Sequence, residues 1–133
     1  MAALKAIPSQ LGTPAVLVVE DELMIRVVLV DELRDAGFLI LEAADAAEGI
    51  TLLNTCPDIR VLVTDIAMPG SFDGNELIRY TRTHFPAVKI IAATASLTHE
   101  PADTVLPKPY QTEHAIILVR RFLQNRRDGA PGF

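Results

Sequence analysis

The chain has 133 residues, of which half are hydrophobic, and its 12 basic and 17 acidic side chains give a formal charge of −5. This length holds one domain with a core of its own, and the composition is that of a folded protein. The acidic balance argues against nucleic-acid binding, which depends on neutralising phosphates with Lys and Arg.

Cysteine usage and hydropathy exclude further classes. Cys56 is the only cysteine, so neither an internal disulfide nor a cysteine-based metal site can form. No apolar run reaches the ~18 residues of a membrane helix, and residues 1–13 lack the apolar segment of a secretory signal. We therefore expect a cytoplasmic protein with no membrane contact.

From residue 15 onward, short β-branched runs alternate with longer segments of helical spacing. The short runs predict strands over 15–19, 38–41, 60–63, 88–92 and 104–106. The first predicted helix has an apolar stripe formed by Leu23, Val27, Val30 and Leu33, and it ends at Gly37. Later helices are predicted from Asp45 to about Asn54, from Asp73 or Asn75 to before Pro86, and from near Thr112 through Leu123.

This alternation predicts an α/β fold with a parallel sheet between helical layers. Five strands favour a flavodoxin-like (βα)5 three-layer sandwich with strand order 2-1-3-4-5. Residues 14–127 form the domain in this interpretation, and 1–13 and 128–133 are loose tails. Ligands of such folds bind at the carboxyl ends of the strands, where the strand order reverses. We therefore look for chemistry after the first and third strands.

Acidic residues stand at both places. Glu20 and Asp21 follow the first strand, and Asp65 follows the third. Neighbouring strands bring these carboxylates into one pocket, where they require a cation or protonation. Oxygen ligands of this kind suit Mg²⁺. Alternatively, Glu20 and Asp21 only stabilise the first turn of the following helix.

The ends of the fourth and fifth strands add two further polar groups. Thr94 ends the fourth strand and Lys108 follows the fifth, so a hydroxyl and a cation join the acids at one sheet edge. A loop lysine or a threonine at a strand end is ordinary taken singly. Their combination, each at the expected strand end, favours a functional site.

These residues resemble bacterial response-regulator receiver domains of the single-domain type over about residues 15–123. The matching segments are Val18-Val19-Glu20-Asp21-Glu22, Asp65-Ile66-Ala67-Met68-Pro69 followed by Asp73-Gly74, Thr94-Ala95 and Lys108-Pro109-Tyr110. The resemblance implies a two-component signalling protein that catalyses only its own phosphorylation and dephosphorylation. Its expected partners are a histidine kinase or a phosphotransfer protein.

The resemblance also implies roles for single residues. Asp65 would be the phospho-acceptor, and Mg²⁺ would be held by Asp21, Glu20, Asp65 and the backbone carbonyl of Ala67. Thr94 and Lys108 would bind phosphoryl oxygens. The peptide bond from Lys108 to Pro109 would be cis.

Three features depart from the usual receiver pattern. Only 14 positions separate Thr94 from Lys108, which predicts that the fourth helix is shortened or absent. Val105 stands where the family often has an aromatic partner for the threonine, so the usual threonine–aromatic switch is not expected. The loop between Met68 and Gly74 has one extra residue.

The last helix leaves a contact surface open. We expect Ile116, Val119 and Leu123 to face the sheet, and parts of Leu118 and Phe122 to form a homodimer or kinase-docking surface.

Two other functions stay in competition with the receiver. A receiver-like binding module would have kept the fold and lost phosphorylation. An aspartate-nucleophile phosphatase would use the same Asp, Thr, Lys and Mg²⁺, but it usually needs a second acid two positions after the nucleophile. Ala67 stands there.

Overall fold

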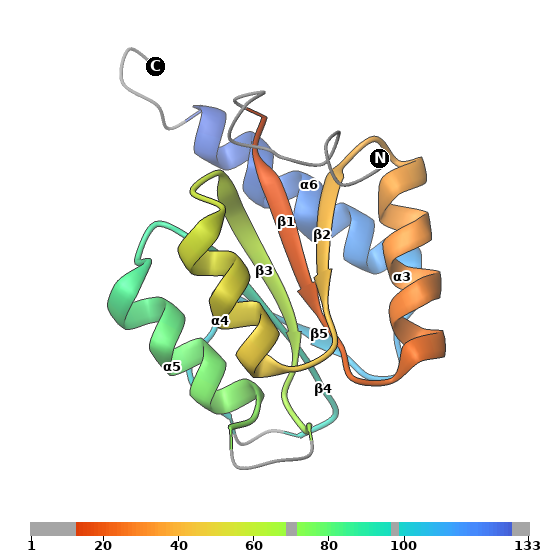
Figure 1. Ribbon diagram of the computed structural model, residues 1–133. Helices are drawn as coiled ribbons and strands as arrows, with labels where there is room; N and C mark the ends of the chain where they lie inside the picture. Colours follow the sequence, from red (N-terminus) through yellow and green to blue (C-terminus); the bar gives the residue numbers. More distant parts are fainter. Residues whose placement is uncertain (1–12, 69–71, 97–98, 129–133) are drawn as a thin grey trace, which may run out of the picture.

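The computed structural model describes residues 13–128 except 69–71 and 97–98 (Figure 1). The predicted tails lie almost wholly outside these residues. Strands and helices alternate in the order β1 (Ala15–Val19), α3 (Leu23–Asp35), β2 (Leu39–Ala43), α4 (Ala46–Thr55), β3 (Ile59–Asp65), α5 (Gly74–His84), β4 (Lys89–Thr94), β5 (Thr104–Pro107) and α6 (Thr112–Asp128). No described helix is long and apolar enough to cross a bilayer.

The five strands form one parallel sheet in the order β2-β1-β3-β4-β5, which confirms the predicted topology. Figure 1 shows the sheet as the middle layer. Val16 and Val18 of β1 join the apolar cluster under α3 and α6, whereas Leu17 and Val19 join the cluster under α4 and α5. Because both faces are covered, β1 is apolar at every position.

Local sequence signals account for the helix ends. The side chains of Asp45 and Asp73 accept hydrogen bonds from N–H groups three residues later, which caps α4 and α5. Asp73 rather than Asn75 is therefore the cap of α5. Gly37 follows α3 with φ of 101°, in the left-handed region where glycine is favoured.

The apolar stripe predicted for α3 is buried only in its second half. Val30 and Leu33 lie in the core, but Leu23 is 58% exposed and Val27 is 40% exposed. The first half of the stripe is a surface feature.

Between β4 and β5 the described residues, 95–96 and 99–103, contain no helix, which agrees with the prediction for the fourth helix. The segment 99–103, called the linker below, is held against α5 by polar contacts. Arg79 Nη2 lies 2.9 Å from Glu100 Oε2, and Arg82 Nε donates to the carbonyl of Pro101 at 2.9 Å. Asp103 Oδ2 accepts from the Ile90 amide at 2.8 Å, which fastens the linker to β4.

Helix α6 corrects the expected contact surface. Leu118 is buried in the core and Phe122 packs against the same cluster, whereas Ile117 is 52% exposed. The expectation that part of Leu118 is available for a contact surface is therefore wrong, because the side chain is buried within the domain. Helix α6 also extends to Asp128, beyond Leu123.

Candidate functional site

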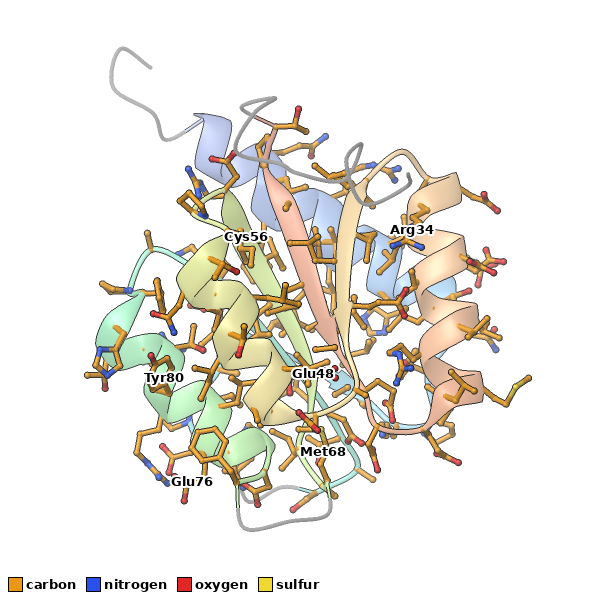
Figure 2. The ribbon with its side chains drawn as sticks, viewed as in Figure 1. Arg34, Glu48, Cys56, Met68, Glu76 and Tyr80 are labelled. Carbon is orange, nitrogen blue, oxygen red and sulfur yellow. The ribbon has the colours of Figure 1, made fainter. Side chains whose placement is uncertain are left out.

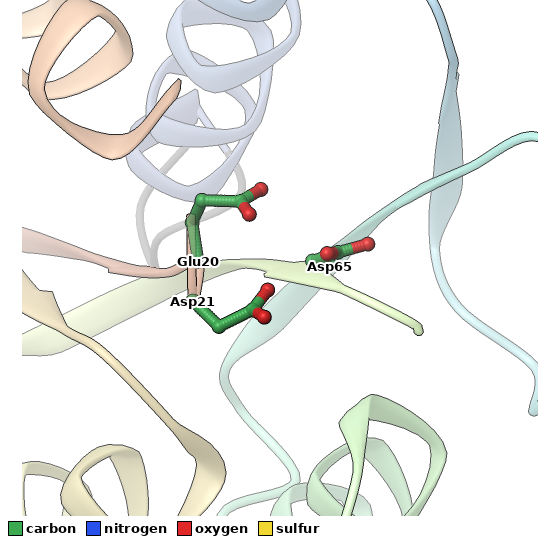
Figure 3. A group of neighbouring side chains, drawn as sticks. All are labelled: Glu20, Asp21 and Asp65. Atoms are coloured by element: carbon green, nitrogen blue, oxygen red, sulfur yellow. The ribbon is translucent and has the colours of Figure 1, made fainter. Parts of the chain in front are cut away.

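The acidic cluster lies where the sequence predicts it, at the carboxyl ends of β1 and β3. These strands pair directly, with Val19 opposite Thr64, so Glu20 and Asp65 emerge side by side. Figure 3 shows the carboxyl groups of Glu20, Asp21 and Asp65 gathered at this edge. One carboxylate oxygen from each residue lies within 4.8 Å of the other two.

Two of these acids are buried and obtain specific partners. Glu20 and Asp65 are 3% and 6% exposed. Glu20 Oε2 accepts a hydrogen bond from the Glu22 amide at 3.0 Å, and Lys108 Nζ donates to Asp65 Oδ1 at 2.9 Å. Lys108 Nζ is also 3.8 Å from Glu20 Oε1, so a single cation serves two carboxylates.

The pKa of Glu20 reflects both its burial and the charges around it. Burial raises the pKa of its carboxyl group, and the negative charges of Asp65 and Asp21 raise it further. The Glu22 amide and Lys108 act in the opposite direction. The carboxylates of the pocket therefore carry more charge than Lys108 alone neutralises.

The donor set fits Mg²⁺. Three carboxylates at mutual reach are hard oxygen ligands, and half-exposed Asp21 leaves the cluster open to water, which Mg²⁺ usually retains. Ala67 is exposed two residues beyond Asp65, and a role for its carbonyl stays a prediction. The extra loop residue falls within 69–71, outside the described part of the chain.

Thr94 and Lys108 meet at the same edge. Thr94 is the last residue of β4, is buried, and its hydroxyl oxygen accepts the Ser96 amide at 2.9 Å. The Lys108 amide donates to the Thr94 carbonyl at 3.1 Å, so the backbones of the two residues are joined directly. The peptide bond from Lys108 to Pro109 is cis.

Two neighbours of the site had no role in the sequence analysis, Arg26 because it was not singled out and Tyr110 because it was only part of a matching segment. Arg26 donates from Nη1 to the Glu20 carbonyl at 2.8 Å, and Tyr110 lines an apolar groove of about 710 Å³ beside Lys108. Burial, aided by the negative charges of Glu20 and Asp65, raises the pKa of Tyr110 to about 12. Arg26 was detectable as a cation one helical turn into α3, although its target was not.

Comparisons with known proteins agree with this geometry. The family model of the response regulator receiver domain matches residues 16–117. The chain is 31% identical over 124 residues to the sensor kinase CckA of Brucella abortus and 33% identical over 122 residues to the DNA-binding transcriptional regulator NtrC of Escherichia coli. These alignments cover 86% and 85% of the chain but only 13% and 25% of those proteins.

Solved structures of similar size also match. The receiver domain of the hybrid histidine kinase CckA is 32% identical with a TM-score of 0.71, over 83% of this chain and 99% of that one. The chemotaxis protein CheY4 of Vibrio cholerae is 25% identical with a TM-score of 0.74, over 83% and 98%. The chain therefore belongs to the response regulator receiver domain family of two-component systems.

Proposed function

We propose that this receiver accepts a phosphoryl group on Asp65 in a Mg²⁺-dependent reaction, and that it signals by protein contact or passes the group along a phosphorelay. The observation that carries the proposal is the surroundings of Asp65. Its carboxylate is buried at a strand end, bonded to Lys108 and within reach of two further acids.

The chemistry follows from positioning and charge. An oxygen of the Asp65 carboxylate forms a bond to phosphorus while the bond from phosphorus to the donor nitrogen of a phosphohistidine breaks. The product is an acyl phosphate, and the released imidazole takes up a proton. Because a carboxylate is a modest nucleophile, catalysis depends on in-line placement and on neutralising the transferred oxygens. Glu20, Asp21, Asp65 and the Ala67 carbonyl would hold Mg²⁺, which would supply positive charge at those oxygens.

Lys108 and Thr94 complete the phosphoryl site. The ammonium group of Lys108 donates a hydrogen bond to Asp65 Oδ1, and it is therefore close enough to pair with a phosphoryl oxygen after transfer. The hydroxyl of Thr94 accepts from Ser96 and still has its own proton to donate. A shift of Thr94 toward the phosphoryl group would pull on Ser96 and on the backbone of Lys108, and so reach the linker.

The surface beside the site supports a protein as the phosphoryl donor. Leu23, Met24, Val27 and Val28 are exposed in the first turns of α3, and Met24 and Val28 line the groove that reaches Lys108. Exposed apolar clusters of this kind usually serve protein contacts. A histidine kinase or a phosphotransfer protein therefore fits this surface. A homodimer through the α6 side, where Phe122 remains partly exposed, stays a prediction.

The test is the intact mass of the chain after incubation with acetyl phosphate, and separately with phosphoramidate, each with and without Mg²⁺. We expect a Mg²⁺-dependent gain of about 80 Da that is absent in Asp65→Asn. No gain from either donor would contradict the proposal and favour a phosphorylation-independent binding module. Continuous turnover of donor without a stable gain, lost in Asp65→Asn, would instead point to a phosphatase.

A further inference from the structure

Arg26 is a charged side chain placed under the acidic cluster. It lies in the first turns of α3, and only 15% of its side chain is exposed. Its Nη1 donates to the carbonyl oxygen of Glu20 at 2.8 Å, and its Nε donates to Glu42 Oε1 at 3.1 Å. Glu42 belongs to β2, so one guanidinium group connects the end of β1, the start of α3 and the neighbouring strand.

These contacts fix the peptide that carries the acids. The Glu20 amide donates to the Ala43 carbonyl of β2 at 3.1 Å, while the Glu20 carbonyl accepts from Arg26. The amide of Glu20 is therefore held by β2 and its carbonyl by Arg26 of α3. This carbonyl is part of the peptide unit that joins Glu20 to Asp21, so the contact with Arg26 restrains the backbone of both acids.

Arg26 and Lys108 contribute positive charge in different ways. Lys108 enters the cluster and bonds a carboxylate oxygen that a metal ion would also use. Arg26 reaches Glu20 through the backbone carbonyl and leaves the carboxylate oxygens available. Its second bond, to Glu42, keeps the guanidinium group from turning into the pocket. Arg26 thus holds the backbone of the cluster without competing for the ligand atoms of the acids.

We propose that Arg26 is a positioning residue, which holds Glu20 and Asp21 in the arrangement that binds Mg²⁺; the inference rests on the proposed function. Holding the Glu20 carbonyl and Glu42 together requires a planar guanidinium group, whose N–H donors point in fixed directions. A lysine has the charge but lacks this planar group, and it cannot hold the Glu20 carbonyl and Glu42 in the same geometry. Loss of a residue that orients metal ligands typically lowers metal affinity by about 10- to 100-fold.

The same helix offers a matched control. Arg34 also pairs with Glu42, at 3.7 Å, and it also donates to a backbone carbonyl, that of Ile40, at 3.1 Å. It lies near the far end of α3 (Figure 2), away from the acidic cluster. Replacing Arg34 removes a comparable set of contacts without touching Glu20.

The experiment is calorimetric titration of Mg²⁺ into the unaltered chain, Arg26→Met and Arg34→Met, with folding of each checked by circular dichroism. We expect Mg²⁺ affinity to fall about 10-fold in Arg26→Met and to stay unchanged in Arg34→Met. The amide resonance of Glu22, which bonds the Glu20 carboxylate, should shift in Arg26→Met alone. A merely structural role would lower both melting temperatures and leave this amide unmoved.

The outcomes separate the inference from the proposed function. Equal Mg²⁺ affinity in Arg26→Met and Arg34→Met would overturn the role of Arg26 and leave the phospho-acceptor site standing. Absence of Mg²⁺ binding by the unaltered chain would overturn both. If Arg26→Met does not fold, the same Mg²⁺ titration is carried out with Arg26→Lys and Arg34→Lys. Weaker binding in the first alone supports the role, and equal binding contradicts it.

Discussion

The acidic cluster at the carboxyl ends of β1 and β3 and the linker that leads into β5 are built in opposite ways. Glu20 and Asp65 extend from strands that are buried on both faces, and short hydrogen bonds fix their carboxylates. The linker has little apolar packing, with only Ala102 in contact with the core. Its exposed ion pairs, chiefly Arg79 with Glu100, hold it on α5.

This difference indicates that the acidic cluster keeps one geometry, whereas the linker can change its conformation. Buried hydrogen bonds to charged groups give a fixed geometry, whereas exposed ion pairs contribute little and are screened by salt. Thr94 and Lys108 stand at the carboxyl ends of β4 and β5, where the Lys108 amide donates a hydrogen bond to the Thr94 carbonyl. We therefore expect substitutions in the cluster to change chemistry and substitutions in the linker to change stability and motion.

The largest effect should come from Lys108→Ala, which removes the cation at Asp65. We expect the rate of phosphorylation by acetyl phosphate to fall roughly 10²-fold, because the transferred oxygens lose a fixed positive partner. Mg²⁺ should bind more tightly at the same time, since the cluster becomes more negative. Mass spectrometry and calorimetry measure the two quantities. A parallel loss of Mg²⁺ binding would mean that Lys108 supports the fold of the cluster instead.

Gly74→Ala should break the geometry of the cluster from the opposite side. A Cβ at Gly74 would come within 2.6 Å of the Ile66 Cα, next to Asp65, and backbone cannot give way easily. We expect a loss of about 3 kcal/mol in the free energy of unfolding, together with slower phosphorylation.

Gly49→Ala is the matched control for this substitution. Its Cβ would meet side chains and no backbone, with Val19 at 3.1 Å and Leu77 at 3.5 Å. The helix gains up to about 1 kcal/mol from alanine, so stability should change little. Urea denaturation compares the two, and equal losses would show that the approach of α5 to Asp65 is not special.

A smaller effect is expected in the linker. Asp103→Ala leaves the Ile90 amide without its carboxylate acceptor, and we expect a loss of about 1–2 kcal/mol. Glu100→Ala removes only exposed contacts with Arg79 and should leave the unfolding midpoint nearly unchanged. Neither variant should slow phosphorylation strongly. A large rate loss in either would erase the distinction between cluster and linker.

The smallest effect concerns Tyr110, whose pKa is raised to about 12 by burial and by the charges of Glu20 and Asp65. The neutral phenol is thus the form preferred in the folded state. Its contribution to stability is full below the pKa of an unfolded tyrosine, about 10, and is lost as the pH rises through 12. Absorbance titration of a Tyr80→Phe chain isolates Tyr110. Asp65→Asn should lower its midpoint, and no change would place Tyr110 outside the field of the cluster.

Much of the fold and the cluster could be predicted because they rest on short-range patterns. Continuous apolar strands indicate a parallel sheet, and parallel order brings residues after β1 and β3 together at one edge. The 14 positions from Thr94 to Lys108 likewise predicted a shortened or absent fourth helix, and residues 95–96 and 99–103, which the structure describes there, contain none.

The failures lie where three-dimensional placement decides. The run from Ala115 to Val119 is apolar at every position, so its spacing could not reveal that Leu118 is buried and Ile117 is exposed. Leu23 likewise fits the apolar stripe of α3 in the sequence, although its side chain is 58% exposed. The link from Arg26 to the Glu20 carbonyl and Glu42 depends on side-chain reach between elements, which no local pattern encodes.

The most direct test of the central claim, that Asp65 is the acceptor, is treatment of the phosphorylated chain with neutral hydroxylamine followed by peptide mass spectrometry. Hydroxylamine attacks the carbonyl carbon of an acyl phosphate, releases phosphate and leaves a hydroxamate on the acid. We predict complete loss of the added phosphoryl mass and a hydroxamate at Asp65. A phosphoryl group that resists hydroxylamine, or a hydroxamate at any other residue, would contradict the account.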